Sequence, residues 1–464
     1  MQARAVALDM LLAVSEGRES HRVFAAELSK YPDMERQERA FARRLAAGVM
    51  ERRLTLDFLL SHYVKSGMGK QKPVIREILR MGMYQLYYME VPPSAACNES
   101  VKLAKKRGFA GLSGYVNGVL RAAARQRIDL QKEVAGLGDG KALSILYSIP
   151  EWLVEKFIVW YGKERSGQIF ASFLEPSGLS VRANLSVADI PALQEKLEQA
   201  GVTVDAGKLH PAALHLSGID TVEKLPGFLR GEFQVQDESS MLPVLCAGIK
   251  AGDYVIDCCA APGGKTIQAA DVLLKARGAR SYCDAGAGTV SARDLSEYKL
   301  SKINENVRRC GFDNIEVMSF DATCLRQEDV GRADVVIADL PCSGLGIIGK
   351  KPDIKYNVSE EGLIELSLLQ RKILSTVAEY VKPGGVLIYS TCTLNPEENE
   401  KNYHFLCGLS GFEPESLDGY LPQKLHSDTT KKGYLTLLPE AGKWDGFFVS
   451  RFRREGGGTM DGTK

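Results

Sequence analysis

The chain of 464 residues is 45% hydrophobic and 25% charged, and it contains ten cysteines. This balance is typical of a globular protein and excludes a disordered chain, and the length allows two or three domains. No apolar run approaches the roughly 18 residues of a membrane span, and Asp9 interrupts the first one, so we expect no membrane association and no signal peptide. No Cys-x-x-Cys spacing occurs, so we expect no metal site, and we expect free thiols in a reducing cytoplasm.

Charge is unevenly distributed, although the net charge is only +1. Residues 1–130 hold 22 Lys and Arg against 13 Asp and Glu, whereas the rest of the chain holds 37 against 45. A basic front end favours a nucleic-acid partner. A solvated helical surface would give the same counts, so charge alone leaves both interpretations open.

Residues 1–135 are predicted to form an all-helical domain. Apolar residues recur there at helical spacing, and several amphipathic helices with short links form a bundle. The stretches LRMGMYQL at 79–86 and VNGVLR at 116–121 resemble the NusB-like RNA-binding domain. The resemblance implies contacts with RNA, for which Arg121 and Arg125 are our candidates.

Residues 140–230 are expected to form a helical linker and a small α+β subdomain. The pattern predicts helices over 152–173 and 190–200, a strand over 179–183 and a turn at Pro226 and Gly227. This subdomain could contact RNA or serve only as a spacer, and the sequence does not choose between the two.

From 231 to 454 the pattern changes to alternating strands and helices. Strands are predicted to end at Asp257, Asp294, Ser319, Asp339, Ser390 and Phe452, with helices after the first, second, fourth and fifth. This order predicts a Rossmann-like α/β domain, an open and mostly parallel doubly wound sheet that binds ligands at the carboxyl ends of its strands. The Gly-rich tail at 455–464 is expected to be disordered.

A glycine-rich turn follows the first of these strands, reading Cys259-Ala260-Ala261-Pro262-Gly263-Gly264-Lys265. Its glycines let the backbone approach a ligand, and the free amides at the helix start favour an anionic group. A nucleoside-triphosphate loop would need glycine in place of Cys259, and the Gly-x-Gly-x-x-Gly pattern of a dinucleotide site is absent.

An S-adenosylmethionine site fits this turn better, because acidic residues follow the later strands. Asp294 can accept hydrogen bonds from both ribose hydroxyls, and Asp321 can accept one from the adenine amino group. Together with Asp339, these acids at successive strand ends favour a cofactor over isolated helix caps.

Two cysteines lie where a predicted strand opens into a polar turn, Cys342 after Asp339 and Cys392 after Ser390. If the two strands are neighbours, both thiols open onto one cleft beside the cofactor. C5 of cytosine is too poor in electrons to attack a methyl sulfonium until a nucleophile adds at C6, and a thiolate suits that task. Asp339 can meet N3 and the exocyclic amine of the ring. One cysteine would add and the other would help release, and the residues alone do not say which.

Four motifs resemble those of RNA cytosine-C5 methyltransferases, namely the stretches 259–266, 339–344, 351–355 and 390–399. With the NusB-like front end, the chain resembles the bacterial RsmB-type (Sun/Fmu) family of 16S ribosomal RNA enzymes. The resemblance implies transfer of a methyl group from S-adenosylmethionine to C5 of one cytosine, position 967, with Cys392 as nucleophile and Cys342 assisting product release. It also makes Lys351 and Lys355 candidate RNA contacts.

Two other functions stay open at this stage. The chain could methylate another RNA such as transfer RNA, or it could be a non-catalytic RNA-binding assembly factor. We expect a monomer with 16S ribosomal RNA as its partner. One departure from the family is a longer connection at 276–288, which we interpret as a surface insertion.

Overall fold

The computed structural model of the chain describes residues 2–176, 178–219, 221–276, 286, 288–440 and 442–456. The chain divides into two compact units, which are treated separately below. The first comprises residues 1–175 and 348–357, and the second comprises residues 176–347 and 358–464. The predicted insertion at 276–288 and tail at 455–464 lie mostly outside the described residues.

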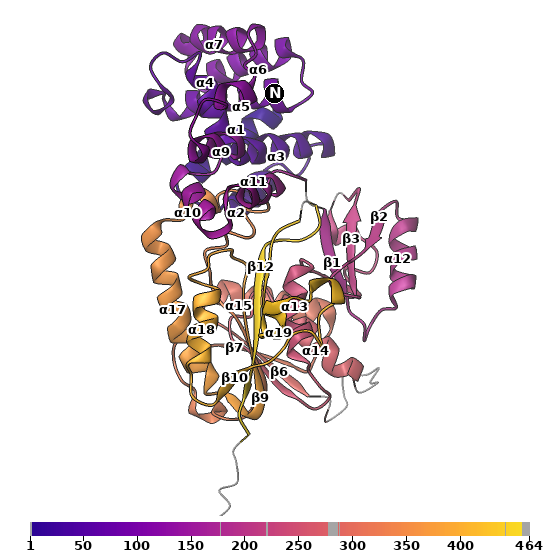
Figure 1. Cartoon of the computed structure of the whole chain (residues 1–464). Coiled ribbons are helices and arrows are strands. Elements are labelled where there is room, and N and C mark those ends of the chain that lie inside the picture. Colours follow the sequence, from indigo (N-terminus) through magenta and orange to yellow (C-terminus); the bar gives the residue numbers. More distant parts are fainter. Residues whose placement is uncertain are drawn as a thin grey trace, which may run out of the picture. The chain divides into compact units, whose positions relative to one another are not determined.

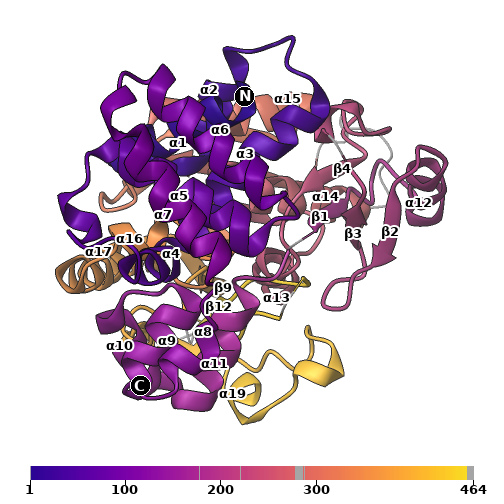
Figure 2. The same cartoon turned by 90° about the horizontal axis from the view of Figure 1, so that it is seen from above.

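The first unit is helical, as predicted, and its helices gather in one bundle (Figure 1). Its helices are α1 (Gln2–Ser15), α2 (Ser20–Ser29), α3 (Arg36–Glu51), α4 (Arg53–Ser61), α5 (Pro73–Tyr88), α6 (Pro93–Lys106), α7 (Ser113–Arg125), α8 (Leu130–Val134), α9 (Asp139–Tyr147), α10 (Glu151–Tyr161), α11 (Lys163–Ser172) and α16 (Ile354–Asn357). Helix α5 is central and contacts α1, α3, α4, α6 and α7 (Figure 2).

Close packing of α5 on α7 explains the two stretches that the sequence singled out. Gly82 of α5 faces Leu120 of α7, and a Cβ added at Gly82 would come within 2.5 Å of the Leu120 side chain. The neighbouring Leu79, Met83 and Val116 are fully or almost fully buried in the same core. The glycine therefore lets the Leu120 side chain pack directly against the backbone of α5, and a side chain at this position would displace Leu120.

The segment 348–357 belongs to this unit although it is distant from it in sequence. The Asp353 carboxylate accepts a hydrogen bond from the Ser20 hydroxyl (2.5 Å), and the Arg53 guanidinium lies 3.5 Å from the centroid of the Tyr356 ring. The Lys355 ammonium donates to the Glu51 carbonyl oxygen (2.7 Å).

The structure corrects the expectation that Lys355 is available to RNA. Its side chain is buried, and burial lowers its pKa to about 7. Its partner Glu51 lies 304 residues away in the chain, so nothing in the local pattern indicated this burial.

The second unit begins with a small antiparallel sheet in the order β2-β3-β1-β4. Its elements are β1 (Leu179–Ala183), α12 (Ile190–Gln199), β2 (Thr203–Ala206), β3 (Ala213–Ser217) and β4 (Phe233–Val235). Alternate residues of its strands, such as Val181 and Leu214, pack with Leu193 and Leu197 of α12 in a core of their own.

The main sheet of this unit has eight strands in the order β10-β12-β9-β8-β5-β6-β7, with β11 beside β12. Strands β5 to β9 pair in parallel, whereas β10, β11 and β12 join antiparallel. The strands are β5 (Tyr254–Asp257), β6 (Thr289–Asp294), β7 (Ile315–Ser319), β8 (Ala333–Asp339), β9 (Val381–Thr391), β10 (Phe412–Pro414), β11 (Tyr434–Leu437) and β12 (Phe447–Arg454). The predicted mostly parallel methyltransferase-type sheet is confirmed.

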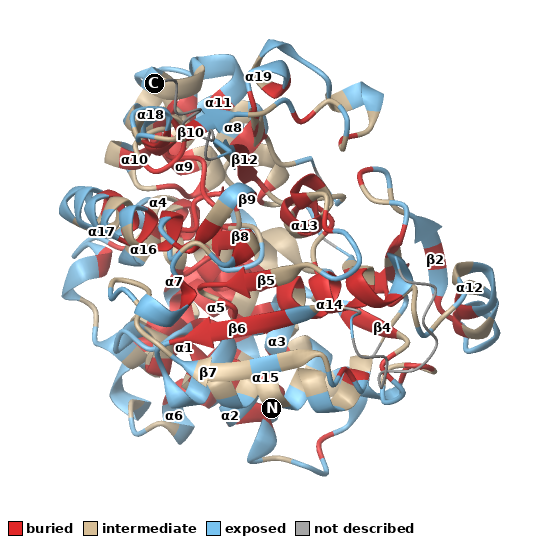
Figure 3. Cartoon of the chain, turned by 90° about the horizontal axis from the view of Figure 1, so that it is seen from below, coloured by how far each residue is buried: buried red, intermediate tan, exposed pale blue. Residues whose placement is uncertain are grey.

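Helices cover both faces of this sheet. They are α13 (Leu242–Ala247), α14 (Gly264–Ala276), α15 (Glu297–Cys310), α17 (Glu360–Ala378), α18 (Glu400–Cys407) and α19 (Asp428–Lys431). In β8, Val335 and Ile337 pack in one core with α13 and α14, while Val336 and Ala338 pack in another with α17. Because helices cover both faces, most residues of β5, β6 and β8 are buried (Figure 3). No helix of the described residues is both long and apolar enough to cross a membrane.

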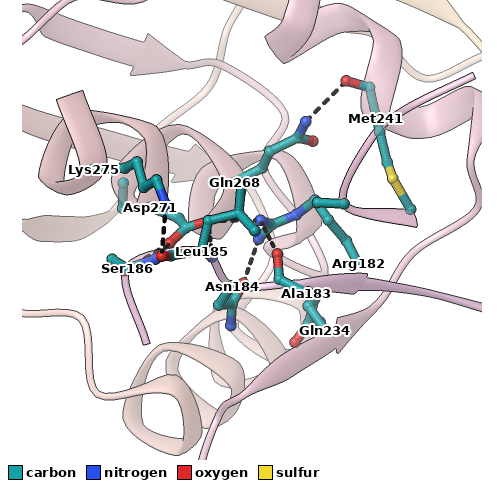
Figure 4. A network of polar contacts seen from close by, with 12 residues as sticks. Arg182, Ala183, Asn184, Leu185, Ser186, Gln234, Met241, Gln268, Asp271 and Lys275 are labelled. Atoms are coloured by element: carbon teal, nitrogen blue, oxygen red, sulfur yellow. Dashed lines mark hydrogen bonds and ion pairs between the residues drawn. The ribbon is translucent and has the colours of Figure 1, made fainter. Parts of the chain in front are cut away.

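A buried polar network joins the small sheet to helix α14 of the main sheet (Figure 4). Arg182 of β1 donates to the Asp271 carboxylate (2.9 Å) and to the Asn184 side chain (2.5 Å), and Arg182 and Asp271 are each 2% exposed at the side chain. Asp271 also accepts from the backbone and hydroxyl of Ser186. Removing one partner of such a pair leaves an uncompensated buried charge. The small sheet is therefore firmly attached to the helix that begins at the glycine-rich turn.

Candidate active site

Two thiols meet at the carboxyl ends of β8 and β9. These strands pair in parallel with Asp339 opposite Ser390, so the chain leaves both at the same edge of the sheet. The Sγ atoms of Cys342 and Cys392 lie 3.3 Å apart, and both cysteines are free and half-buried. The structure thus brings together the two cysteines that the sequence selected.

Hydrogen bonds hold the two cysteine-bearing loops against each other. The Ser343 hydroxyl lies 2.7 Å from the Thr393 hydroxyl, and the Ser343 backbone amide donates to the Glu398 carboxylate (2.9 Å). The Gly346 amide donates to the Cys392 carbonyl oxygen (3.1 Å). A Cβ at Gly346 would collide with the backbone of Gly446 and of Cys392. The two thiols are therefore positioned by the backbone around them.

The environment of Cys342 keeps its proton on the sulfur. The adjacent Cys392 thiol and burial raise the pKa of Cys342 well above its ordinary value. A protonated Cys342 can donate its hydrogen to the Cys392 sulfur. The two cysteines thus differ in their surroundings although they lie side by side.

Asp339 lines the same pocket as Cys392 and contacts Lys265 and Ser390. Its Oδ2 is 2.6 Å from the Lys265 ammonium, and its Oδ1 accepts from the Ser390 hydroxyl (2.8 Å). Lys265 also donates to the Ser240 hydroxyl (2.8 Å). As a carboxylate, Asp339 accepts hydrogen bonds and donates none.

The glycine-rich turn and Cys392 open onto one pocket with a volume of about 240 Å³. Seven of the predicted cofactor residues line it: Cys259, Ala260, Ala261, Pro262, Gly264, Lys265 and Asp339. Cys392 lines it as well. Gly263 stands beside it with a φ of +102°, a conformation that side chains rarely adopt, and so allows the tight turn into α14.

Asp294 and Asp321 do not line this pocket in the structure. The Asp294 carboxylate is buried and accepts from the backbone amides of Ala261 (3.2 Å) and Leu295 (2.8 Å). Its bond to Ala261 holds the backbone of the glycine-rich turn in place. Asp321 is half-exposed, and the backbone amide of Thr323 lowers its pKa. Their roles in binding the cofactor stay predictions.

Asp257 is a pocket residue that the sequence did not assign to the site. It ends β5, and its Oδ2 accepts from the Thr266 hydroxyl (2.7 Å), while its Oδ1 is buried without a hydrogen-bond partner. Burial raises its pKa to about 7. Its position directly before the glycine-rich turn is the sequence feature that could have identified Asp257 as a site residue. No local pattern in the sequence indicated several further residues of the lining, which are Gln236, Asp237, Ser239, Ser240, Ile347, Asp445 and Phe447.

We expect Asp257 to make folding stability fall as the pH rises from about 4 to about 7. The folded protein holds this proton up to about pH 7, whereas the unfolded chain loses it near pH 4, so the stabilisation is complete below pH 4 and is lost between these values. Urea unfolding of the wild type and of Asp257→Asn should differ in pH dependence by an amount on the order of 4 kcal/mol. The control is Asp313→Asn, at an exposed position, whose stability should depend on pH as that of the wild type does. If the stability of Asp257→Asn followed the same pH dependence as the wild type, the raised pKa would be contradicted.

The remaining sequence candidates lie in the first unit. Arg121 and Arg125 are exposed on α7, and the Arg121 guanidinium donates to the Asn117 side chain (2.9 Å). Lys351 is exposed, in contrast to the buried Lys355. Among the described residues, no group of three or more His, Cys, Asp or Glu is placed to hold a metal ion.

Comparison with known proteins gives matches along nearly the whole chain. The model for 16S rRNA methyltransferases RsmB/F matches residues 245–453, the NusB family model matches 1–125, and the ferredoxin-like domain of RsmF/B-like methyltransferases matches 149–223. The crystal structure of PH0851 is similar in fold, with a TM-score of 0.80 at 23% identity over 97% of this chain and 98% of that one. NSun6 from Pyrococcus horikoshii with SFG has a TM-score of 0.56 at 21% identity, over 67% and 99%.

Two curated relatives are similar over most of their length. The probable ribosomal RNA small subunit methyltransferase B of Bacillus subtilis (strain 168) is 32% identical over 98% of this chain and 99% of its own. The protein of the same name from Synechocystis sp. is 33% identical over 92% of this chain and 93% of its own. The chain therefore belongs to the RsmB/F family of S-adenosylmethionine-dependent 16S ribosomal RNA methyltransferases.

Proposed function

We propose that this protein transfers a methyl group from S-adenosylmethionine to C5 of a cytosine in 16S ribosomal RNA through a covalent intermediate. The observation that carries the proposal is that Cys392 lines the same pocket as the glycine-rich turn, with the thiol of Cys342 3.3 Å from its own. Attack at C6 and removal of the C5 proton are two separate tasks, and two adjacent sulfur groups suit them.

The pocket fits the charges of S-adenosylmethionine. Its ammonium group can donate to the unpartnered Oδ1 of Asp257, and its carboxylate can accept from the first backbone amides of α14. When bound, this cofactor supplies an electrophilic methyl group on a sulfonium. We further propose that Asp294 and Asp321 contribute to binding its adenosine part, Asp294 through the turn that it supports.

In the proposed reaction, the Cys392 thiolate adds to C6 of the target cytosine, and the electron pair of the C5–C6 bond makes C5 nucleophilic. The Asp339 carboxylate accepts a hydrogen bond from the exocyclic amine and orients the ring. After methylation, Cys342 first loses its own proton to solvent and then, as a thiolate, takes the proton from C5. The electrons of that C–H bond re-form the double bond and expel the Cys392 sulfur.

The surroundings of Cys342 support this order of events. The largest cause of its raised pKa is the adjacent Cys392 thiol. Once the Cys392 sulfur is bonded to C6, that interaction with a free thiol is gone, so the pKa of Cys342 falls and its thiolate becomes available as a base. The same cysteine is therefore protonated before attack and able to accept a proton afterwards.

Arg121, Arg125 and Lys351 remain proposed RNA contacts, because each is exposed and positively charged. The buried Lys355 is no longer among them.

The proposal is tested by the product. The purified protein, 16S RNA made by transcription and methyl-labelled S-adenosylmethionine should give labelled 5-methylcytidine after digestion to nucleosides. Label on another nucleoside would refute the C5 chemistry. Label on transfer RNA but not on 16S RNA would change the substrate, and no transfer to either RNA would favour a non-catalytic assembly factor.

A further inference from the structure

Two lysine side chains lie over Trp444 in the second unit, and a third lysine, Lys208, lies beside one of them. The ammonium groups of Lys424 and Lys443 lie 5.5 and 5.9 Å from the centroid of the Trp444 ring. The Lys208 side chain lies close to that of Lys443, and this contact, followed by burial and the charges of Lys208 and Lys424, lowers the pKa of Lys443. Within the described part of the chain, Glu440 forms an ion pair with Lys443, so three positive charges meet one negative charge.

The backbone fixes where these side chains arise. Lys208 follows β2 in a turn held by the Gly207 amide, which donates to the Ala213 carbonyl oxygen (2.8 Å). The Trp444 indole N–H donates to the Leu438 carbonyl oxygen (3.1 Å). Lys424 lies in the short helical turn Gln423–Leu425. Like charges that converge from three separate segments repel each other, and an anion bound between them removes that repulsion.

The chain connects the cluster directly to the candidate active site. Asp445 and Phe447, which follow Trp444 closely in the chain, line the pocket that contains Cys392. The polar network of Arg182 and Asp271 ties the small sheet, which supplies Lys208, to the helix behind that pocket (Figure 4). A nucleotide strand with one base in the pocket would therefore place its neighbouring phosphates within reach of these lysines.

We propose that Lys208, Lys424, Lys443 and Trp444 form a binding site for the sugar–phosphate backbone of the RNA segment next to the target cytidine. The lysines bind phosphate oxygens, and the Trp444 ring offers a stacking surface to an adjacent base. The identity of the RNA rests on the proposed function. The small sheet then takes part in substrate binding through Lys208, which decides between the two roles that the sequence left open for it.

The test is a triple variant, Lys208→Gln, Lys424→Gln and Lys443→Gln, in the full chain. Affinity for a 16S RNA fragment is measured by filter binding at several salt concentrations. We expect affinity to fall about tenfold, and the slope of log K against log salt to decrease by about 0.7 for each phosphate that the variant no longer binds. The matching Lys→Arg triple should keep both values. Gln replacements of the exposed Lys224, Lys250 and Lys432 remove the same charge and serve as the control.

The thermal midpoint and donor binding of each variant show that it is folded. If the Lys208, Lys424 and Lys443 variant binds RNA as the control does, with the same salt slope, the proposed site is wrong. This readout needs no catalysis. A wild type that binds RNA through these lysines without transferring methyl groups would refute the proposed function and leave this site standing.

Discussion

Cys392→Ala should abolish methyl transfer to 16S RNA, lowering the rate on the order of 10⁴-fold or more, because without attack at C6 the cytosine C5 is not nucleophilic. Cys392 lines the pocket but provides none of the charged groups that fit S-adenosylmethionine. Donor binding, measured by calorimetry, should therefore persist in the variant. The measurement is the initial rate of label transfer at saturating RNA.

The control for this experiment is Cys324→Ala, which removes an exposed free thiol from the same unit. It should transfer methyl groups at the wild-type rate. Substantial activity in Cys392→Ala would mean that Cys342 or another group attacks the ring, and the roles of the two cysteines would have to be exchanged.

Cys342→Ala should show the opposite behaviour and trap the protein on its RNA. Its Sγ is 3.3 Å from that of Cys392, so it is the side chain best placed to take the C5 proton that must leave before the sulfur is expelled. Without it, we expect a labelled complex of protein and RNA that survives denaturing electrophoresis, with at most one methyl group transferred per protein molecule.

The double variant Cys342→Ala with Cys392→Ala should form no such complex, because it lacks the nucleophile. Repeated turnover by Cys342→Ala at the wild-type rate would show that a different base removes the proton, and would leave Cys342 without a catalytic role.

The sequence predicted the parts of the site that depend on local pattern. Strand ends mark the edge of a parallel sheet, so the approach of Cys342 to Cys392 followed once β8 and β9 were expected to be neighbours. The glycine-rich turn was recognisable because its backbone conformation requires particular residues. Strands β10 and β11 were missed, since they have three and four residues and join the sheet antiparallel at its edge.

Features that depend on distant contacts could not be predicted. Lys355 looked like a surface residue until Glu51, 304 positions away, supplied its partner. The unpartnered oxygen of Asp257 is a result of packing around β5, and Lys208 meets Lys443 only when the small sheet is attached to the main one. Periodicity identifies which residues are buried, but it does not identify which of them meet.

The most direct test of the account uses 16S RNA in which cytidine is replaced by 5-fluorocytidine. With fluorine in place of hydrogen at C5, there is no proton for a base to remove. The reaction should therefore stop with the methylated base still bonded to the protein. After nuclease and protease digestion, mass spectrometry should find the modified nucleotide on the peptide that contains Cys392. A nucleotide on the Cys342 peptide, or no covalent adduct despite methylation of ordinary RNA, would contradict the central claim that Cys392 bonds to the target cytosine.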